Sequence, residues 1–312
     1  WAPSVGGSQV VNNLSVHDDY AFFVGEFNCV GEFVDSSTAR VGADGSLHGW
    51  NPQFDGEPEA FLFTSNTLYV GGDFTSVGSE IRGRGAAFNV VDGVASLTPN
   101  DWNPDLDDSI LAFALNESAL YVGGDFEAAG ENDRNYGAAF DMTEGVASST
   151  ASVWDPDFDG PVNALAFSAS MLFAGGDFYS VGEEDRPYAA AFDAGVGVMN
   201  SAPNDWYPEP DDSVESLAVS ENVVVVGGKF TLINYEDSGQ YDDSEVARNY
   251  LAAFSINANG EASSTPNDFA PRMEEDGDRV NALNVRPDRA IVGGRYTLAA
   301  YDLITGEVFA NH

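Results

Sequence analysis

The sequence predicts an all-β protein, a six-bladed β-propeller whose blades are four-stranded antiparallel sheets repeated about every 50 residues. Two recurring markers support this prediction. Exact or close copies of the motif LYVGGDF occupy residues 22–27, 68–74, 120–126, 172–178, 224–230 and 290–296. An aromatic residue followed two positions later by proline recurs in step with that motif. Self-similarity at a fixed period of this length is typical of propeller blades.

The spacing of the two markers divides the chain into six repeats. The aromatic residue that ends the motif falls at Phe27, Phe74, Phe126, Phe178, Phe230 and Tyr296, in steps of 47, 52, 52, 52 and 66 residues. The aromatic-x-Pro marker begins at Trp1, Trp50, Trp102, Trp154, Trp206 and Phe269. We therefore expect one domain, residues 1–312, with repeats at approximately 1–49, 50–101, 102–153, 154–205, 206–268 and 269–312.

The third repeat illustrates the expected blade. Its mostly apolar segment 109–116 and its β-branched and aromatic segment 119–129 predict the first two strands. Small residues in 135–142 predict a third strand, and the polar segment 146–153 predicts an outer edge strand. The glycine pair inside the second strand is expected to let a neighbouring chain approach closely. The recurring Trp and Phe residues are expected to fill the space between adjacent sheets.

Closure into a ring is favoured because radial repetition leaves only short, protected sheet edges. Residues 1–3 carry the aromatic-x-Pro marker of a unit whose outer strand would be 307–312, so the chain is expected to start where it finishes. The alternatives are an open β-solenoid and a seven-bladed ring completed by sequence outside this chain.

The string LYVGGDFTSVG at 68–78, followed by Arg82 and by AAF at 86–88, resembles the delta-60-type repeat β-propeller family. A related string, VNALAF, stands at 162–167, and the resemblance covers essentially the whole chain. It implies a propeller module of a secreted or surface-anchored protein, and it supplies no catalytic residues. The first repeat departs from the pattern, because Glu26 replaces the second glycine of the motif.

Acidic residues dominate the charge of the chain. There are 51 Asp and Glu against 12 Lys and Arg, a net charge of −39. Such a charge destabilises a compact fold unless salt screens it, so the composition is typical of a halophilic protein. An acidic, calcium-loaded extracellular protein is the alternative. Nucleic acid is not an expected partner because no basic stripe is present to neutralise phosphates.

Localisation is expected to be extracellular or at the cell surface, with a signal segment absent from this chain. No apolar run is long enough for a direct membrane span. The single Cys29 excludes an internal disulfide. Asn116 begins a sequon in a predicted exposed turn and is the candidate glycosylation site.

The acidic junction between the third and fourth repeats has calcium-loop spacing. Asp155, Asp157 and Asp159 precede a glycine in a D-x-D-x-D-G pattern, and Asn163 could supply a further oxygen. The pattern lacks the glutamate expected at the twelfth position. Ca²⁺ is therefore a candidate ligand beside the alternative of a solvated acidic turn, and no other cofactor is expected.

An arginine recurs nine residues after the motif aspartate in three repeats. We expect structural Asp–Arg pairs between strand and loop, and the alternative is a ring of arginines that binds an anion. The expected pairs are Asp73 with Arg82, Asp125 with Arg134, and Asp177 with Arg186.

The fifth repeat carries an insertion, NYEDSGQYDDSE at 234–245, in the loop after its motif strand. Repeat proteins often place unit-specific insertions on a binding face. The insertion is therefore the first-choice binding site, and a solvated excursion is the alternative. Its candidate contact residues are Tyr235, Glu236, Asp237, Tyr241, Asp242, Asp243 and Glu245.

No catalytic motif is recognisable, because the histidines are scattered and neither G-x-S-x-G nor a phosphate-binding loop is present. The expected function is a non-catalytic, rigid scaffold whose acidic loop face contacts a protein, a glycan or another subunit. Self-assembly and membership of a larger surface polypeptide fit the same pattern. The alternative is a polysaccharide-active enzyme with a central pocket lined by Asn12, Glu59, Asn163, Glu215 and Asn281.

Overall fold

The structure is a computed structural model. It describes residues 5–6, 10–17, 20–26, 29–30, 33–34, 38–42, 46–48, 50–168, 170–195, 200–235, 245–258, 260–271, 279–294 and 298–308. Before Trp50, side chains are described for Thr38, Arg40 and Ser46, and Leu298 is described by its backbone. Within these residues, no helix has the length and apolar character needed to cross a membrane.

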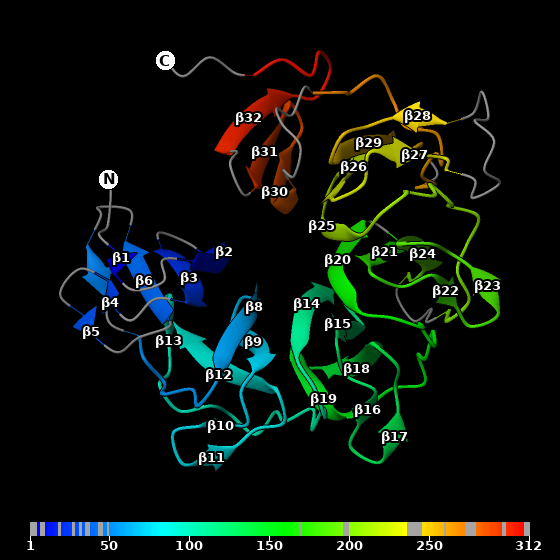
Figure 1. The fold of residues 1–312 in the computed structure, drawn as a ribbon. Coiled ribbons are helices and arrows are strands. Elements are labelled where there is room, and N and C mark those ends of the chain that lie inside the picture. Colours follow the sequence, from blue (N-terminus) through cyan, green and yellow to red (C-terminus); the bar gives the residue numbers. More distant parts are fainter. Residues whose placement is uncertain are drawn as a thin grey trace. The chain divides into compact units, whose positions relative to one another are not determined.

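The chain divides into two compact units. Unit 1 comprises Trp1–Phe113, Glu117–Arg134 and Ala138–Ser152. Unit 2 comprises Ala114–Asn116, Asn135–Gly137 and Val153–His312. Both units are made of antiparallel sheets, as the alternation of apolar strands and turns predicted (Figure 1).

Three four-stranded sheets account for most of unit 1. The first has the order β2-β3-β6-β7, with strands β2 (Val10–His17), β3 (Tyr20–Glu26), β6 (Thr38–Gly42) and β7 (Leu47–His48). The second has the order β13-β12-β9-β8, with strands β8 (Glu57–Phe63), β9 (Thr67–Asp73), β12 (Gly85–Val91) and β13 (Val94–Ala95). The third has the order β14-β15-β18-β19, with strands β14 (Ile110–Leu115), β15 (Ala119–Gly124), β18 (Gly137–Thr143) and β19 (Val146–Ala151).

Shorter strands accompany these sheets. A small sheet has the order β1-β4-β5, with strands β1 (Val5–Gly6), β4 (Cys29–Val30) and β5 (Phe33–Val34). Two-stranded ribbons are formed by β10 (Ser76–Val77) with β11 (Glu80–Ile81), and by β16 (Ala128–Ala129) with β17 (Asn132–Asp133). Each ribbon follows a motif strand, so the predicted second strand 119–129 ends at Gly124 and its last residues enter a ribbon.

The described residues of unit 2 form three three-stranded sheets. Their strands are β20 (Val162–Ser168), β21 (Met171–Gly176) and β24 (Ala189–Asp193); β25 (Val214–Ser220), β26 (Val223–Gly228) and β29 (Leu251–Ser255); and β30 (Val280–Arg286), β31 (Arg289–Gly294) and β32 (Leu298–Asp302). Two ribbons are formed by β22 (Ser180–Val181) with β23 (Glu184–Asp185), and by β27 (Leu232–Ile233) with β28 (Val246–Ala247).

The recurring tryptophans join neighbouring sheets within each unit. In unit 1, the Trp102 ring lies edge-on to Tyr69 of β9 at 5.1 Å and to Phe140 of β18 at 6.0 Å between centroids. In unit 2, Trp206 makes the same contacts with Phe173 at 5.1 Å and Phe254 at 5.6 Å. Edge-to-face packing of this kind adds about 0.5–1.5 kcal/mol per pair beyond apolar burial. The predicted role of the tryptophans between sheets is confirmed for these pairs.

In three repeats, the first glycine of the motif pair allows the next sheet to approach. A Cβ atom placed on Gly71 would lie 2.5 Å from the Cβ of Ile110 in β14. At the same position in unit 2, a Cβ on Gly175 would lie 2.3 Å from Cγ1 of Val214 in β25. Neither separation is compatible with a side chain, so glycine is required by the closeness of the neighbouring strand.

In four repeat junctions, an aspartate holds the start of a ribbon. The Asp55 carboxylate accepts the backbone N–H groups of Thr75 and Ser76, both at 2.8 Å. Three more aspartates accept the amides at the same relative positions with separations of 2.6–3.0 Å: Asp107, Asp159 and Asp211. We call these four residues the junction aspartates. Their bonds turn the chain out of the motif strand and into the ribbon.

The recurring arginines bind backbone carbonyls, so the expected pairing of Asp73 with Arg82 is wrong. Arg82 donates to the Ile81 and Asn100 carbonyls, each at 2.7 Å, and Asp73 pairs with Arg84 instead. Arg134, Arg186 and Arg248 repeat this pattern on the preceding carbonyl and on the carbonyls of Ser152, Asn204 and Asn267.

We call these four residues the loop arginines. The acceptor of each lies two positions before the next aromatic-x-Pro marker, so the arginine ties its loop to the end of its repeat. The Asp177–Arg186 expectation is also wrong, because Arg186 pairs with Glu184 at 2.8 Å and Asp177 accepts from Asn163 at 3.2 Å. Asp125 lies at the end of the motif strand and Arg134 lies in the loop, and a pair between these two residues stays a prediction. The physical reason is geometric: the planar guanidinium matches two carbonyls that converge on the loop.

Candidate functional site

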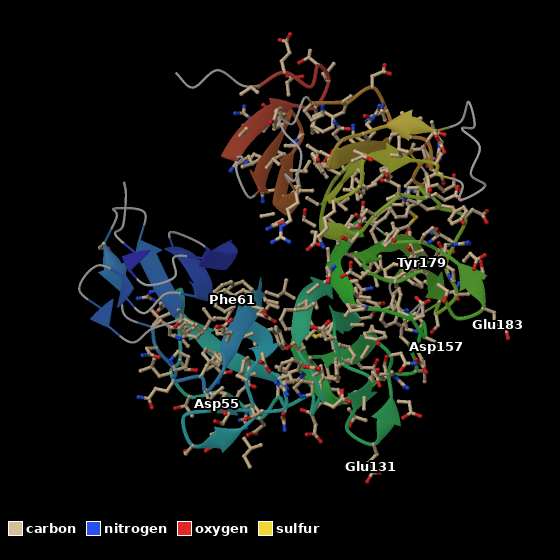
Figure 2. All side chains as sticks on the ribbon, in the orientation of Figure 1. Asp55, Phe61, Glu131, Asp157, Tyr179 and Glu183 are labelled. Atoms are coloured by element: carbon tan, nitrogen blue, oxygen red, sulfur yellow. The ribbon has the colours of Figure 1, made fainter. Side chains whose placement is uncertain are left out.

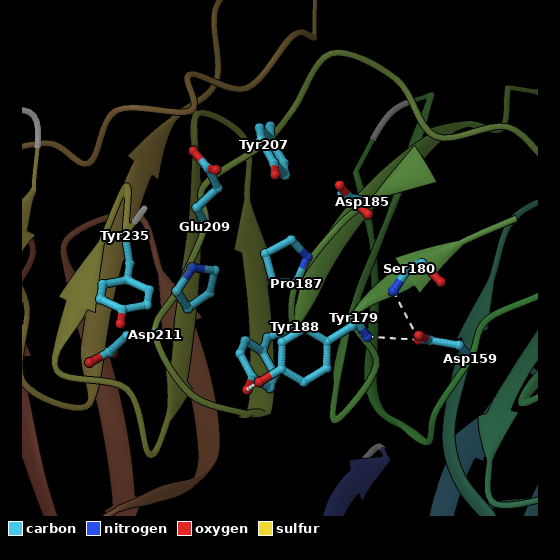
Figure 3. Close-up of a pocket in the computed structure, with 11 residues that line it drawn as sticks. Asp159, Tyr179, Ser180, Asp185, Pro187, Tyr188, Tyr207, Glu209, Asp211 and Tyr235 are labelled. Atoms are coloured by element: carbon cyan, nitrogen blue, oxygen red, sulfur yellow. Dashed lines mark hydrogen bonds between the residues drawn. The ribbon is translucent and has the colours of Figure 1, made fainter. Parts of the chain in front are cut away.

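A cleft of about 840 Å³ lies on unit 2 and is lined by tyrosines, prolines and carboxylates (Figure 3). We call it the tyrosine cleft. Its lining residues are Asp159, Tyr179, Ser180, Asp185, Pro187, Tyr188, Tyr207, Glu209, Pro210, Asp211 and Tyr235. They come from the junctions before β20 and β25, from ribbon β22–β23 and the residue before it, from the loop before β24, and from the residues that follow β27. The volume is in the range of ligand-binding clefts.

Two of the tyrosines form a linked pair. The Tyr179 and Tyr188 rings are 4.9 Å apart between centroids with an interplanar angle of 57°. The Tyr188 hydroxyl donates to the Tyr179 hydroxyl, as Figure 3 shows. Burial raises the pKa of Tyr188, and its bond to Tyr179 raises it further. Tyr179 remains 61% exposed, so its ring face is available to a ligand.

Tyr207 forms another part of the lining. The guanidinium carbon of Arg186 lies 4.9 Å from its ring centroid, in cation–π geometry. Burial raises the pKa of Tyr207 to about 12, and the charge of Glu209 and a hydrogen bond with that carboxylate act in the same direction. The loop arginine therefore has a second role here, because it supports a tyrosine of the cleft in addition to binding carbonyls.

The four carboxylates of the cleft differ in their contacts. Asp159 and Asp211 are junction aspartates, and one oxygen of each already accepts two backbone amides. Asp185 ends ribbon strand β23 and is exposed, while Glu209 lies beside Tyr207. Among the described residues that line the cleft, none is Lys or Arg. The cleft therefore combines aromatic surface with carboxylates, and Arg186 lies over the Tyr207 ring beside them.

The aromatic lining is specific to this part of the chain. Tyr179 occupies the position held by Thr75, Glu127 and Thr231 in other repeats. Tyr207 occupies the position held by Asn51, Asn103, Asp155 and Ala270. Tyr235 occupies the position held by Ser79, Glu131 and Glu183, and the last two project from the ribbon tips in Figure 2. Tyr188 instead recurs as Tyr136 and Tyr250. Three aromatic residues have thus replaced small or polar ones where the repeat framework does not require them.

The predicted binding insertion contributes one residue to the cleft. Tyr235 lines it and is 36% exposed. Glu245 is half-buried directly before β28. The other predicted contact residues lie outside the described residues: Glu236, Asp237, Tyr241, Asp242 and Asp243. The sequence analysis missed Tyr179, Tyr188 and Tyr207, although aligning the repeats position by position would have singled out Tyr179 and Tyr207.

The residues of the predicted calcium loop have separate partners. Asp159 accepts the amides of ribbon β22–β23, Asp157 accepts from the Asn135 side chain at 2.6 Å, and Asn163 donates to Asp177. The backbone N–H of Asp155 donates to the Ser201 hydroxyl at 2.9 Å. Within the described part of the chain, no group of three or more His, Cys, Asp or Glu side chains could hold a metal ion. The carboxylates of Asp157 and Asp159 thus have partners within the fold, and calcium binding stays a prediction.

The sequon asparagine is less open than its turn predicted. Asn116 is half-buried, and its amide nitrogen donates to the Ala194 carbonyl at 2.8 Å. A glycan attached to the Asn116 amide nitrogen would have to leave room for the hydrogen bond to Ala194 or replace it.

The residues proposed for a central pocket differ in their burial and in their partners. Burial raises the pKa of Glu59 to about 7, and the charges of Asp125, Asp73, Glu57 and Asp108 act in the same direction. In unit 2, Glu215 pairs with Lys229 at 2.6 Å, and Asn281 is exposed. The side chain of Asn12 lies outside the described residues.

No protein-family model and no curated protein matches the chain. Solved structures show similarity of fold. The WD40 β-propeller domain of Doa1 has a TM-score of 0.60 at 12% identity, covering 98% of this chain and 83% of its own. The computationally designed Ika8 protein has a TM-score of 0.55 at 15% identity, with coverages of 98% and 88%. The Neurospora crassa Pan2 WD40 domain has a TM-score of 0.53 at 12% identity, with coverages of 96% and 77%. At these identities the similarity establishes the fold, that of an all-β propeller.

Proposed function

We propose that this chain is a non-catalytic propeller module that acts as a rigid scaffold and binds a macromolecular partner in the tyrosine cleft. The observation that carries the proposal is the set of tyrosines at positions 179, 207 and 235, where the other repeats have small or polar residues. Aromatic residues that stay accessible on a rigid framework are typical of binding surfaces, because they contribute large contact area at low entropic cost.

The test is quantitative affinity capture from the secretions or envelope of the producing cells. The wild-type protein is compared with the double variant Tyr179→Ser, Tyr207→Ser and with Val153→Ser. Val153 is 84% exposed and lies outside the cleft, so it is a matched control for loss of an apolar surface residue. We expect a partner retained by the wild type and by the control but lost by the double variant. An identical set of retained proteins in all three samples would refute a binding role for the cleft.

The scaffold we propose is a closed ring of six blades. The sequence repeats and the six main sheets of the two units support it. Gly293 provides a test, because it is the counterpart of Gly71, Gly175 and Gly227 in the last repeat. The nearest described atom to a Cβ on Gly293 is the Ala282 Cβ at 3.5 Å, an ordinary contact. In a closed ring a neighbouring strand would approach Gly293 as β30 approaches Gly227, so Gly293→Ala would destabilise the protein as strongly as Gly227→Ala. A neutral Gly293→Ala would contradict closure.

We further propose an extracellular or cell-surface setting at high salt. The acidic composition and the resemblance to surface propeller modules support this setting. A partner protein or glycan, a second subunit and a larger surface polypeptide all suit such a scaffold. Fractionation of the producing cells, with immunodetection of the protein, tests the location directly, and recovery from the cytoplasm alone would contradict it.

An alternative function, a polysaccharide-active enzyme, is favoured by one observation. A carboxyl with a pKa of about 7, as for Glu59, is suited to donate a proton at neutral pH. One oxygen of this side chain is buried without a hydrogen-bond partner among the described residues. The test is turnover of a glycan panel by the wild type and by Glu59→Gln. Turnover that depends on Glu59 would establish the enzyme, and its absence on every glycan would reject it.

A further inference from the structure

From the chemistry of the tyrosine cleft we infer that its occupant is an arginine side chain carried by an extended segment of a partner protein. This inference rests on the proposed binding role of the cleft and names the chemistry that the cleft selects. Four tyrosines and four carboxylates line the cleft, and its described lining contains no basic residue. Aromatic faces and carboxylates both attract cations, so the two parts of the lining favour the same ligand.

The net charge of the whole chain also favours a cationic ligand. A net charge of −39 repels anionic partners and steers cationic ones toward the surface. That attraction is general and is screened by salt. Selection of one site therefore has to come from the aromatic rings, whose contact with a cation is short-range.

The hydrogen-bonding groups of the cleft argue against a sugar as the occupant. A sugar requires alternating donors and acceptors for its hydroxyl groups. The hydroxyls of Tyr179 and Tyr188 bond to each other, and the Tyr207 hydroxyl bonds to Glu209. The open groups of the lining include the ring surface of Tyr179 and the carboxylate oxygens of Asp185. These groups accept a cation without needing further donors.

A guanidinium fits this lining better than a metal ion or an ammonium group. No described group of acidic side chains could hold a metal ion. A planar guanidinium stacks on aromatic faces while its N–H groups reach carboxylates. The protein already makes such a contact, since Arg186 lies over the Tyr207 ring at 4.9 Å. The whole cleft, about 840 Å³, is large enough for an arginine and the residues that flank it, and Pro187 and Pro210 offer rigid surfaces to those residues.

The inference is tested by calorimetric titration of the purified protein with short peptides that contain two arginines among glycine and serine. Matched peptides carry citrulline, which keeps the shape without the charge, or lysine. Titrations are run at about 0.15 M and about 2 M KCl, since general electrostatic attraction is screened at the higher concentration. We expect the arginine peptide to bind at both concentrations, the citrulline peptide at least about tenfold more weakly, and the lysine peptide about threefold more weakly.

Variants locate the binding. Tyr179→Leu and Tyr207→Leu should each weaken the arginine peptide about 3- to 30-fold, whereas Tyr179→Phe should bind as the wild type does, because the ring face is retained. Asp185→Asn should weaken binding several-fold. Its control is Asp133→Asn, the same position one repeat earlier, which should remain within about twofold of the wild type. Circular dichroism and thermal unfolding confirm that each variant is folded, and Asp185→Asn keeps the test valid if a tyrosine variant fails to fold.

Several results would overturn the inference. Equal binding of the citrulline peptide would show that charge is not recognised, and equal binding of the lysine peptide would reject the guanidinium assignment. Equal weakening by Asp185→Asn and Asp133→Asn, with the tyrosine variants unaffected, would show only general attraction to an acidic surface. If the peptides fail to bind but affinity capture still finds a partner that the Tyr179→Ser, Tyr207→Ser variant loses, only the assignment of an arginine is rejected. If capture finds none, the binding role of the cleft falls as well.

Discussion

The junction aspartates lead to a quantitative prediction about stability, and Asp55 is the best case. Its carboxylate accepts the Thr75 and Ser76 amides at 2.8 Å and the Thr75 hydroxyl at 2.7 Å. Partial burial opposes ionisation, but these hydrogen bonds outweigh it and lower the pKa of Asp55 from 3.8 to about 2. A shift of this size corresponds to at most about 2.5 kcal/mol. Because Asp55 is exposed and its bonds are screened by water, we expect Asp55→Asn to lower the free energy of unfolding by about 1 kcal/mol at neutral pH.

The effect of Asp55→Asn on the free energy of unfolding should depend on pH in one direction. The pKa of Asp55 is lower in the folded protein than in the unfolded chain, so its charge stabilises the fold above about pH 4. That contribution is lost as the pH falls through about 2. The difference in unfolding free energy between the wild type and Asp55→Asn should therefore be full at pH 7 and shrink toward zero near pH 2.

The assay is chemical denaturation at a series of pH values, with hydrogen exchange of residues 74–78 as a local measurement. We expect the Thr75 and Ser76 amides to exchange about fivefold faster in Asp55→Asn. The control is Asp141→Asn, which removes the same charge from an exposed position on β18. Equal stability of Asp55→Asn and wild type at pH 7, or a difference that persists unchanged at pH 2, would refute the reasoning.

Four further predictions follow from the same structure. A lysine at position 82 cannot bind the Ile81 and Asn100 carbonyls together as the planar guanidinium does, both at 2.7 Å. Arg82→Lys should therefore lower the free energy of unfolding by about 1–3 kcal/mol in urea titrations, and an unchanged urea midpoint would contradict this role of Arg82. Gly71→Ala, whose Cβ would lie 2.5 Å from Ile110, should cost about 1–3 kcal/mol by the same measurement, and full stability would show that the neighbouring strand can move. The melting temperature should rise strongly between about 0.1 M and about 3 M KCl, and a flat response would remove the high-salt proposal. Millimolar Ca²⁺ added at high KCl should leave the melting temperature unchanged, because Asp157 and Asp159 already bind Asn135 and backbone amides; added stability would restore the calcium site.

Local features of the repeat were predictable from the sequence because they depend on periodicity. The third repeat shows this most clearly: expected strands 109–116, 135–142 and 146–153 correspond to β14, β18 and β19. The packing of Trp102 between Tyr69 and Phe140 follows from the same logic, since a large aromatic residue recurring at each junction has to fill the space between sheets.

The partners of charged residues could not be predicted in the same way. A sequence shows which carboxylates are near an arginine along the chain, but backbone carbonyls are present at every position and carry no signal. Arg82 therefore suggested Asp73, whereas folding brings the Asn100 carbonyl to it across 18 residues. The tyrosine cleft was missed for another reason. The insertion stood out by its length, whereas Tyr179 and Tyr207 are single replacements that become visible only when equivalent positions are compared.

The hydrogen bonds of the loop after β9 also constrain how the chain folds as it is synthesised. The Gly83 amide donates to the Asn103 side chain at 2.9 Å, and its carbonyl accepts from Leu106 at 3.1 Å. Both partners belong to the following repeat, about 20 residues nearer the C-terminus. The second repeat therefore cannot complete this loop on the ribosome until the beginning of the third repeat has emerged.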